Sequence, residues 1–238
     1  MLAGARLTDR DREILVALAR VAYLTTRQIA ILAGFGSERR ARGRMAGLRD
    51  LGLAALVAKG ARGAVNPSWT LTKRGEKLVP TLDAPLHYRA QSLGAPLLGE
   101  VLVVSGVYAA LAASGSEIDW HLLPDLRWSA QAKASGMHTP RPWAVLTLNS
   151  GARVAFELDR PARRGADIEA VIARWTRWRI VESDWRDTDV MYVVPSEVRR
   201  ATVTQVAAAR TWFAPMSNPA TVVGQDLAPA GGPSSGDA

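Results

Sequence analysis

Residues 25–51 read TTRQIAILAGFGSERRARGRMAGLRDL, and this stretch predicts two helices joined by a turn. Thr25 is followed three residues later by Gln28, which is the capping-box pattern of a helix start. Glycines end that helix, and Ser37 then caps a second helix over residues 38–51, which Gly52 closes. Two helices around a glycine-containing turn are typical of a helix-turn-helix.

The flanking sequence predicts the other elements of a winged helix. Thr8 and Asp11 repeat the capping pattern and begin an earlier helix. Downstream, apolar runs at 53–57 and 65–71 are joined by KGARGAVNP, and a glycine- and proline-rich tip between apolar runs predicts a β-hairpin. Three helices and a hairpin are the order of a winged helix-turn-helix, whose third helix enters the DNA major groove.

The third helix carries its arginines and small residues away from its apolar stripe. Apolar residues at helical spacing from Ala41 to Leu51 predict the buried face. The opposite face suits groove entry, because arginines reach guanine edges or phosphates while small residues permit close approach. Lys59 and Arg62 lie at the hairpin tip, where a wing meets DNA. The predicted DNA contacts are Arg27, Ser37, Arg39, Arg40, Arg42, Gly43, Arg44, Ala46, Lys59 and Arg62.

Charge is distributed unevenly along the chain. Residues 1–80 hold 15 of the 30 Lys and Arg residues but 6 of the 22 Asp and Glu residues, a net charge of +9. The remaining 158 residues carry a net charge of −1. A basic surface gains affinity for phosphate backbones by releasing counterions, so the first third predicts a polyanionic partner. The alternative is a three-helix module for protein contact whose arginines form a solvated face.

Composition excludes several classes of site. The 238 residues contain no cysteine, which excludes disulfides, thiolate zinc sites and cysteine nucleophiles. The histidines are His87, His121 and His138, too few to favour a histidine-built metal centre. The start of the chain has no apolar signal region, and the longest apolar stretch, 97–113, is interrupted by polar residues. We therefore expect a cytoplasmic protein with no membrane segment and no cofactor.

Residues 81–214 predict a second domain built on a small mixed sheet. The expected order is α-β-β-β-α-β-α. Its helices are expected over 91–113, 166–179 and 196–210, and its strands over 118–122, 143–148, 153–158 and 190–194. The division is thus 1–80 for the winged helix, 81–214 for this α/β (α+β) domain, and 215–238 for a tail with too few apolar residues to order itself.

Several stretches resemble the replication-relaxation family of actinobacterial plasmids, phages and integrated elements. LTDRDREILVALARVAYLTTRQIAIL, SERRARGRMAGLRDLGL and WTLTKRGEKLV resemble its N-terminal winged helix. RVAFELDRPARRGADIEAVIARW and DVMYVVP resemble its second domain, which is similar to the PD-(D/E)xK nuclease fold. The resemblance implies a role in replication, mobilisation or repression on a mobile element.

The nuclease pattern is incomplete in this sequence. Its chemistry needs an Asp after Pro on one hairpin strand, and an acid two residues before a Lys on the next, to hold a divalent cation and orient water. Here Trp143 stands where the pattern has Asp, and Asp159 replaces the Lys after Glu157. We therefore expect no catalytic residues, no metal site and a second domain that keeps only the fold.

Two interpretations of the acidic pair stay open. In one, the chain is a metal-dependent endonuclease or nickase that uses Glu157, Asp159 and Asp125. In the other, which the sequence favours, the two acids pair at a sheet edge with Arg153, Arg160 or Arg163. The predicted function is thus sequence-specific binding of double-stranded DNA without catalysis, as a regulator or an accessory factor. Its second domain would serve homodimerisation, further DNA contact or partner binding.

Overall fold

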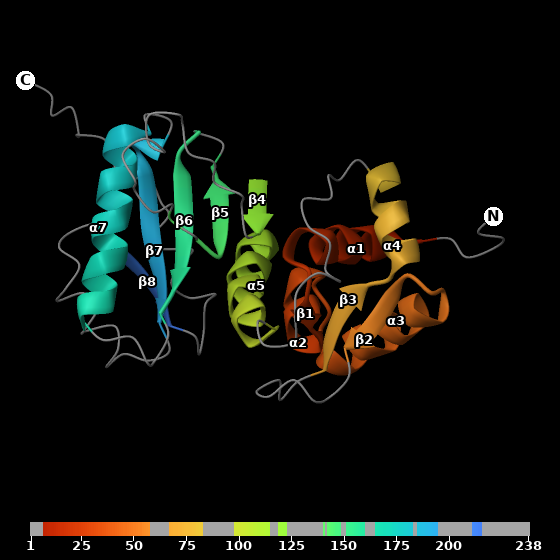
Figure 1. Ribbon diagram of the computed structural model, residues 1–238. Helices are drawn as coiled ribbons and strands as arrows, with labels where there is room; N and C mark the ends of the chain where they lie inside the picture. The colour runs from red at the N-terminus through yellow and green to blue at the C-terminus, as the bar shows by residue number, and fades with distance from the viewer. Residues whose placement is uncertain are drawn as a thin grey trace, which may run out of the picture.

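The structure is a computed structural model and describes residues 7–57, 67–82, 98–114, 119–122, 140, 142–148, 151–159, 165–182, 185–194 and 211–215. Over these residues the chain is a mixed α/β protein with six α-helices and two sheets (Figure 1). The first half contains α1 (Asp9–Val21), β1 (Leu24–Thr25), α2 (Thr26–Leu32), α3 (Glu38–Asp50), β2 (Ala54–Val57), β3 (Ser68–Leu71), α4 (Lys73–Leu78) and a 3-10 helix (Val79–Leu82). The second contains α5 (Leu98–Ala113), β4 (Asp119–Leu122), β5 (Ala144–Thr147), β6 (Arg153–Leu158), α7 (Gly165–Val181), β7 (Thr188–Val194) and β8 (Thr211–Pro215).

The helix starts predicted from the sequence are confirmed. The Thr8 and Thr25 side chains each accept a hydrogen bond from the N3 backbone amide, and the backbone amide of each cap residue donates to the N3 side chain, Asp11 or Gln28. Ser37 caps α3, and Gly52 follows its end with φ +68°, in the left-handed region that glycine tolerates. These local contacts fix where the three N-terminal helices begin and where α3 ends.

The first sheet has the order β1-β3-β2, and both of its pairings are antiparallel. β2 and β3 form the predicted hairpin, with Ala54 opposite Leu71 and Val57 opposite Ser68. The hairpin tip, with Lys59 and Arg62, lies outside the described residues. Three helices and a three-stranded sheet in this order are compatible with the predicted winged helix.

The second sheet has the order β4-β5-β6-β7-β8. Strands β4 to β6 run antiparallel, whereas β7 and β8 continue parallel to β6, with α7 as the crossover between β6 and β7. The predicted α-β-β-β-α-β order is confirmed from α5 to β7. Strand β8 was not predicted, because residues 211–215 were assigned to the end of the second domain and the start of the tail. The predicted helix 196–210 and the rest of the tail lie outside the described residues.

The two faces of this sheet pack against different helices. Residues of β5 and β6 alternate between two clusters, since successive strand residues point to opposite faces. Phe156 belongs to the cluster shared with α5, whereas Val145 and Ala155 pack with Trp175 of α7. Figure 1 shows the resulting layers, α7 on one side of the sheet and α5 on the other.

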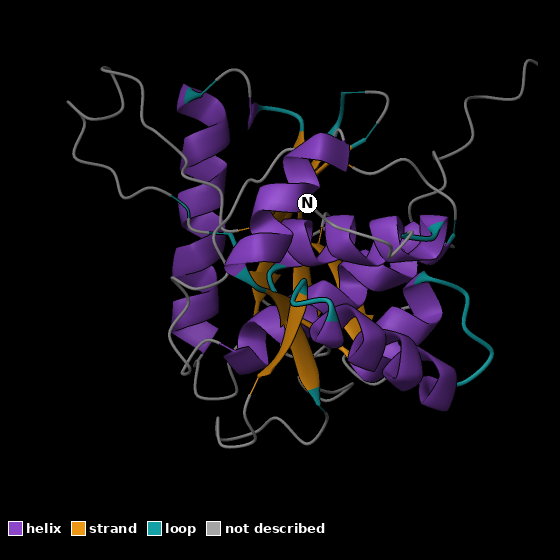
Figure 2. Ribbon diagram, turned by 90° about the vertical axis from the view of Figure 1, so that its right-hand side faces the viewer, coloured by secondary structure: helices purple, strands orange, loops and turns teal. Residues whose placement is uncertain are grey.

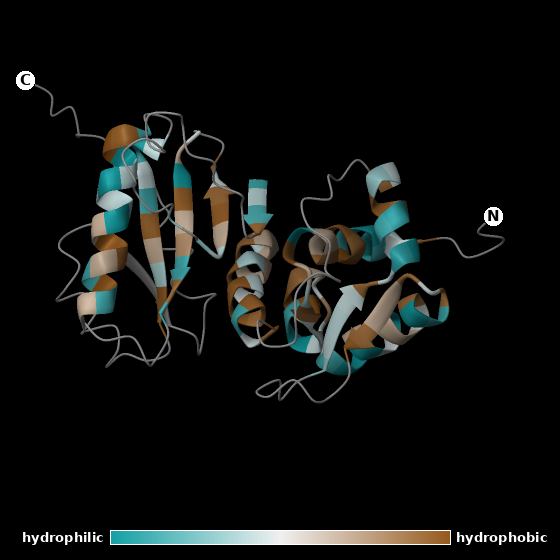
Figure 3. Ribbon diagram, in the orientation of Figure 1, coloured by the Kyte–Doolittle hydropathy of each residue, from teal (hydrophilic) through white to brown (hydrophobic). Residues whose placement is uncertain are grey.

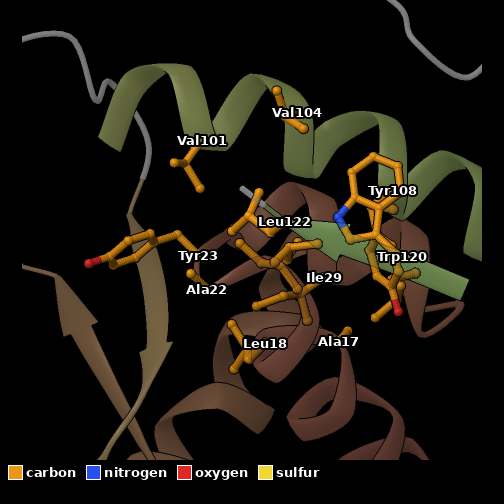
Figure 4. Close-up of a cluster of buried hydrophobic side chains, with 14 of the residues drawn as sticks. Ala17, Leu18, Ala22, Tyr23, Ile29, Val101, Val104, Tyr108, Trp120 and Leu122 are labelled. Carbon is orange, nitrogen blue, oxygen red and sulfur yellow. The ribbon is translucent and has the colours of Figure 1, made fainter. Parts of the chain in front are cut away.

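Helix α5 also joins the second sheet to the winged helix. Its residues Val101 and Val104 belong to one cluster with Leu18 and Ile29 of the N-terminal helices (Figure 4). The Gln28 amide Nε2 donates to the carbonyl oxygen of Leu102 at 2.7 Å. The hydrophobic core therefore crosses the boundary placed near residue 80, although the boundary itself stays a prediction.

The hydropathy of the helices agrees with their positions in the fold. In Figure 3, α5 is largely apolar or neutral along its length, whereas α3 and α4 each contain clearly hydrophilic turns. Figure 2 looks onto the N-terminal helices, with strands visible behind them. No helix among the described residues combines the length and the apolar character that crossing a membrane requires.

Candidate nucleic-acid interface

Helix α3 presents a basic face to solvent. Ala41, Met45 and Leu48 are fully buried, as the sequence pattern predicted. Leu51, predicted as the end of that stripe, is the C-cap residue and is only half-buried. Around the rest of the helix, Ala46 and Gly47 are half-buried, and the exposed residues include Arg39, Arg40, Arg42 and Gly43. The interior thus fixes the orientation of α3, and most of its predicted DNA contacts point outward.

The two glycines of α3 face open space. A Cβ added to Gly43 or Gly47 would meet no heavy atom within 4 Å apart from the backbone of the helix itself. Glycine in a helix interior costs about 1 kcal/mol relative to alanine, because its backbone loses more freedom on folding. Among the described residues no contact offsets this cost, so the packing of that part of the chain does not explain the two glycines.

Two further predicted contacts, Arg27 and Ser37, precede α3 in the sequence. Arg27 of α2 is exposed. Ser37 is exposed as well, but its hydroxyl accepts a hydrogen bond from the backbone amide of Arg40 at 3.4 Å and so serves as the helix cap. The capping role and a DNA contact are compatible at this position, because a hydroxyl oxygen has two lone pairs and one proton.

Arg44 differs from the other predicted contacts. Its guanidinium donates two hydrogen bonds to the carboxylate of Asp11, which is completely buried at the start of α1. The Arg44 side chain is 37% exposed, but the pair holds its charged end against α1. Arg44 thus joins α1 to α3, and its contact with DNA stays a prediction.

The Asp11–Arg44 pair shifts both side chains toward their charged forms. Burial alone would raise the pKa of Asp11, but hydrogen bonds from Arg44 and from the backbone and side chain of Thr8 outweigh it and lower that pKa. The hydrogen bond to Asp11 raises the pKa of Arg44. Since the pKa of Asp11 is lower in the folded state, its contribution to stability is present above the unfolded pKa and is lost as pH falls through the folded value.

The turn before α3 gathers two arginines, one of which the sequence analysis did not select. Arg10 of α1 places its guanidinium carbon 5.5 Å from the centroid of the Phe35 ring. A Cβ added to Gly36 would lie 3.8 Å from Nη1 of Arg40, so Arg40 reaches back over the same turn. The contact between Arg10 and Phe35 joins residues far apart in sequence, and no local pattern predicted it.

The acidic pair of the second domain lies in the interior. Glu157 and Asp159 are 5% and 2% exposed, and β6 is the central strand of its sheet, so the predicted sheet-edge position is wrong. Glu157 accepts a hydrogen bond from the indole Nε1 of Trp175 at 2.9 Å, within the layer between sheet and α7. The backbone amide of Asp159 donates to the carbonyl oxygen of Val193 at 2.9 Å, which extends the pairing of β6 with β7.

Trp143 and Asp125 are the other two residues that the nuclease pattern concerns. The backbone amide of Trp143 donates to the carbonyl oxygen of Phe156 at 2.7 Å, and Ala144 is paired in register with the same residue, so Trp143 lies opposite Phe156 and not Glu157. Its ring packs with Phe156 in the cluster on the α5 side, and the aromatic ring beside Glu157 is that of Trp175. Asp125 lies outside the described residues, and within them no three acidic or histidine side chains are grouped so as to hold a metal ion.

Comparison with known proteins identifies the family of the chain. The family model described as replication-relaxation matches residues 15–190, a range that runs from within α1 to within β7. The match thus includes α3 with its basic face, the shared helix α5 and the β5-β6 hairpin with Glu157. Neither a curated protein nor a solved structure matches the chain. Because the match covers most of the sequence, the chain belongs to the replication-relaxation family.

Proposed function

We propose that this protein binds double-stranded DNA through the exposed face of α3 and acts without cutting it. The observation that carries the proposal is the combination of three exposed arginines with two glycines that the packing of the described residues does not require. Arginine recognises guanine edges and phosphates, and a helix face without side chains lets a nucleic-acid backbone or base edge approach closely.

Family membership supports the biological setting of the proposal. A replication-relaxation protein is expected to act in the replication or mobilisation of a mobile element. Within that setting, sequence-specific binding as a transcriptional regulator or as an accessory factor would use the same face of α3. A surface for protein contact is the alternative, but a cluster of arginines around glycines fits a polyanion better than it fits an apolar partner.

The two glycines provide the sharpest test of the DNA-binding face. Changing Gly43 and Gly47 to alanine should raise stability, by about 0.5–1 kcal/mol for each residue, because alanine favours helix and the added methyl groups meet open space. The same changes should weaken DNA binding several-fold, since the methyl groups would hold the DNA away from the arginines. Denaturant unfolding measures the first effect, and fluorescence anisotropy with a labelled duplex measures the second.

Gly99→Ala is the matched control for this test. Gly99 is exposed near the start of α5, and a Cβ there would also meet open space. We expect this variant to keep full DNA affinity. Unchanged affinity in Gly43→Ala and Gly47→Ala would contradict close approach at α3, and failure of the unmodified protein to bind duplex at low salt would contradict the proposed function as a whole.

The proposal also predicts that the protein leaves DNA intact. Metal-assisted hydrolysis needs carboxylate oxygens placed to bind an ion and a group that orients water. Glu157 instead holds the Trp175 indole, and Asp159 brings a negative charge where the nuclease pattern has lysine. Supercoiled plasmid incubated with stoichiometric protein and Mg²⁺ or Mn²⁺ should remain uncut. Nicking that disappears in Glu157→Gln, which keeps an acceptor oxygen for Trp175, would favour the endonuclease alternative.

A further inference from the structure

The turn between α2 and α3, residues 33–37, is flanked by arginines from two helices. Arg10 comes from the first turn of α1 and lies over the Phe35 ring, within the range of a cation–π interaction. Arg40 comes from the first turn of α3, and its Nη1 lies beside Gly36. Both side chains are exposed, so two positive charges face solvent at one short turn.

Acidic groups lie near this turn, but among the described residues none of them forms an ion pair with Arg10 or Arg40. Asp11 follows Arg10 in the sequence, but its carboxylate is committed to Arg44 and Thr8. Asp9 precedes Arg10, and Glu38 is the first residue of α3; both are exposed. Glu13 follows one helical turn after Arg10: burial raises its pKa, and the charge of Arg10 opposes that rise only in part. The charge of Arg10 therefore favours the ionised form of Glu13. Among the described residues, the two side chains do not form an ion pair.

The position of the turn indicates which group these arginines would meet. Helix α3 has 13 residues and is about 20 Å long, whereas the major groove is about 12 Å wide. When the exposed face of α3 lies in the groove, the segment before its first residue projects toward the rim, where the phosphates of one strand run. In helix-turn-helix proteins this rim is also where the helices preceding the recognition helix cross the backbone.

On the basis of the proposed function, we infer that Arg10 and Arg40 together clamp a backbone phosphate of the bound duplex at the α2–α3 turn. The guanidinium fork matches a phosphate bidentately, and stacking on Phe35 orders the Arg10 side chain before DNA arrives. An ordered side chain loses less entropy on binding, so the ring increases the contribution of Arg10 without touching DNA. Because phosphates carry no sequence information, this contact supports affinity for any sequence.

The test compares two arginines of the same helix. Arg10→Ala and Arg12→Ala remove the same charge from neighbouring exposed positions of α1, but only Arg10 contacts the turn. Binding to a labelled duplex of random sequence is measured by anisotropy over a series of salt concentrations. We expect Arg10→Ala to lower affinity several-fold and to reduce the salt slope by about one, and Arg12→Ala to change both by less than half as much.

Two more variants test how Arg10 is held. Phe35→Leu keeps an apolar side chain at this partly buried position but removes the ring face, and it should lower affinity by less than Arg10→Ala does. Arg10→Lys keeps the charge without the planar fork and should recover part of the binding. Equal effects of Arg10→Ala and Arg12→Ala would overturn the clamp. If Gly43→Ala weakens binding while Arg10→Ala does not, the clamp fails and the proposed function stands.

Discussion

Replacing Gly75 by alanine should destabilise the fold by about 3 kcal/mol or more, an effect at the upper end for a single added methyl group. A Cβ at this position of α4 would lie 2.2 Å from the backbone oxygen of Leu53 and 3.1 Å from Cδ2 of Leu71. At 2.2 Å the atoms overlap, so one of the two backbones must shift. Thermal or denaturant unfolding followed by circular dichroism measures the loss, which corresponds to a decrease in Tm of about 6–12 °C in a chain of this size.

The surroundings of Gly75 explain why no easy adjustment is available. The carbonyl oxygen of Leu53 accepts hydrogen bonds from the backbone amide of Thr72 at 3.1 Å and from its hydroxyl at 3.3 Å. The Leu53 and Leu71 side chains are buried in the core, which is packed too densely to absorb the movement. Thr72 also caps α4 by accepting from the amide of Gly75 at 3.1 Å, so a shift of α4 would break the cap.

Gly43→Ala is the matched control for this prediction. It makes the same chemical change within a helix, yet its methyl group meets open space and should stabilise the protein. Opposite signs for the two variants would show that the space around each glycine, and not the change of residue, decides the outcome. A Gly75→Ala variant as stable as the unmodified protein would mean that α4 does not pack against Leu53.

The sequence predicts best those features that lie within a few residues of one another. The Thr8–Asp11 and Thr25–Gln28 capping boxes and the Ser37 cap each span three residues, so the local pattern contains all of the interacting groups. The same holds for the left-handed Gly52 and for the buried stripe of α3. Helix propensity and the spacing of apolar residues act over this range, and they predicted the boundaries of the N-terminal helices to within a few residues.

Contacts between distant segments could not be predicted in this way. Asp11 and Arg44 are 33 residues apart, and on α3 alone Arg44 resembles the other arginines of the basic face. Glu157 accepts a hydrogen bond from Trp175 of α7, the next helix along the chain. This acid is therefore buried between the sheet and α7, and not at a sheet edge as the sequence predicted. Each case depends on how helices pack, and a single sequence gives no direct measure of that packing.

The apolar character of α5 indicates that this helix packs against both halves of the chain. A helix that is apolar around its whole circumference must be covered on all sides, which requires structure both before and after it. Apart from Glu100 and Ser105, residues 97–113 have this character, and in the structure α5 contributes to one cluster with the N-terminal helices and with Trp120 and Phe156 of the second sheet. Such a helix predicts that the N-terminal helices and the second sheet share one hydrophobic core, even though the composition near residue 80 suggests a domain boundary there.

The double variant Arg39→Ala and Arg42→Ala should lose at least about thirtyfold in affinity for the DNA sequence that the protein prefers. Both side chains are exposed on the N-terminal half of α3, the part of a recognition helix that usually meets base edges. An arginine that binds guanine contributes about 1–3 kcal/mol of discrimination, so two of them contribute about 2–6 kcal/mol if their effects add. A preferred sequence obtained by selection from random duplexes provides the ligand, and anisotropy gives its Kd.

Comparison with an unrelated duplex separates sequence reading from simple charge loss. Removing two charges should weaken binding to any duplex, whereas loss of base contacts should weaken the preferred sequence more. Arg177 of α7 and Arg186 are exposed, and Arg186 follows Trp185, whose ring packs against Trp178 of α7. Helix α7 lies at the far side of the molecule from α3 in Figure 1. The double alanine variant of Arg177 and Arg186 carries the same net charge as the α3 variant and should keep its preference for the selected sequence. If both double variants lose affinity equally for both duplexes, α3 supplies charge but does not read bases, and the sequence specificity must come from another part of the chain.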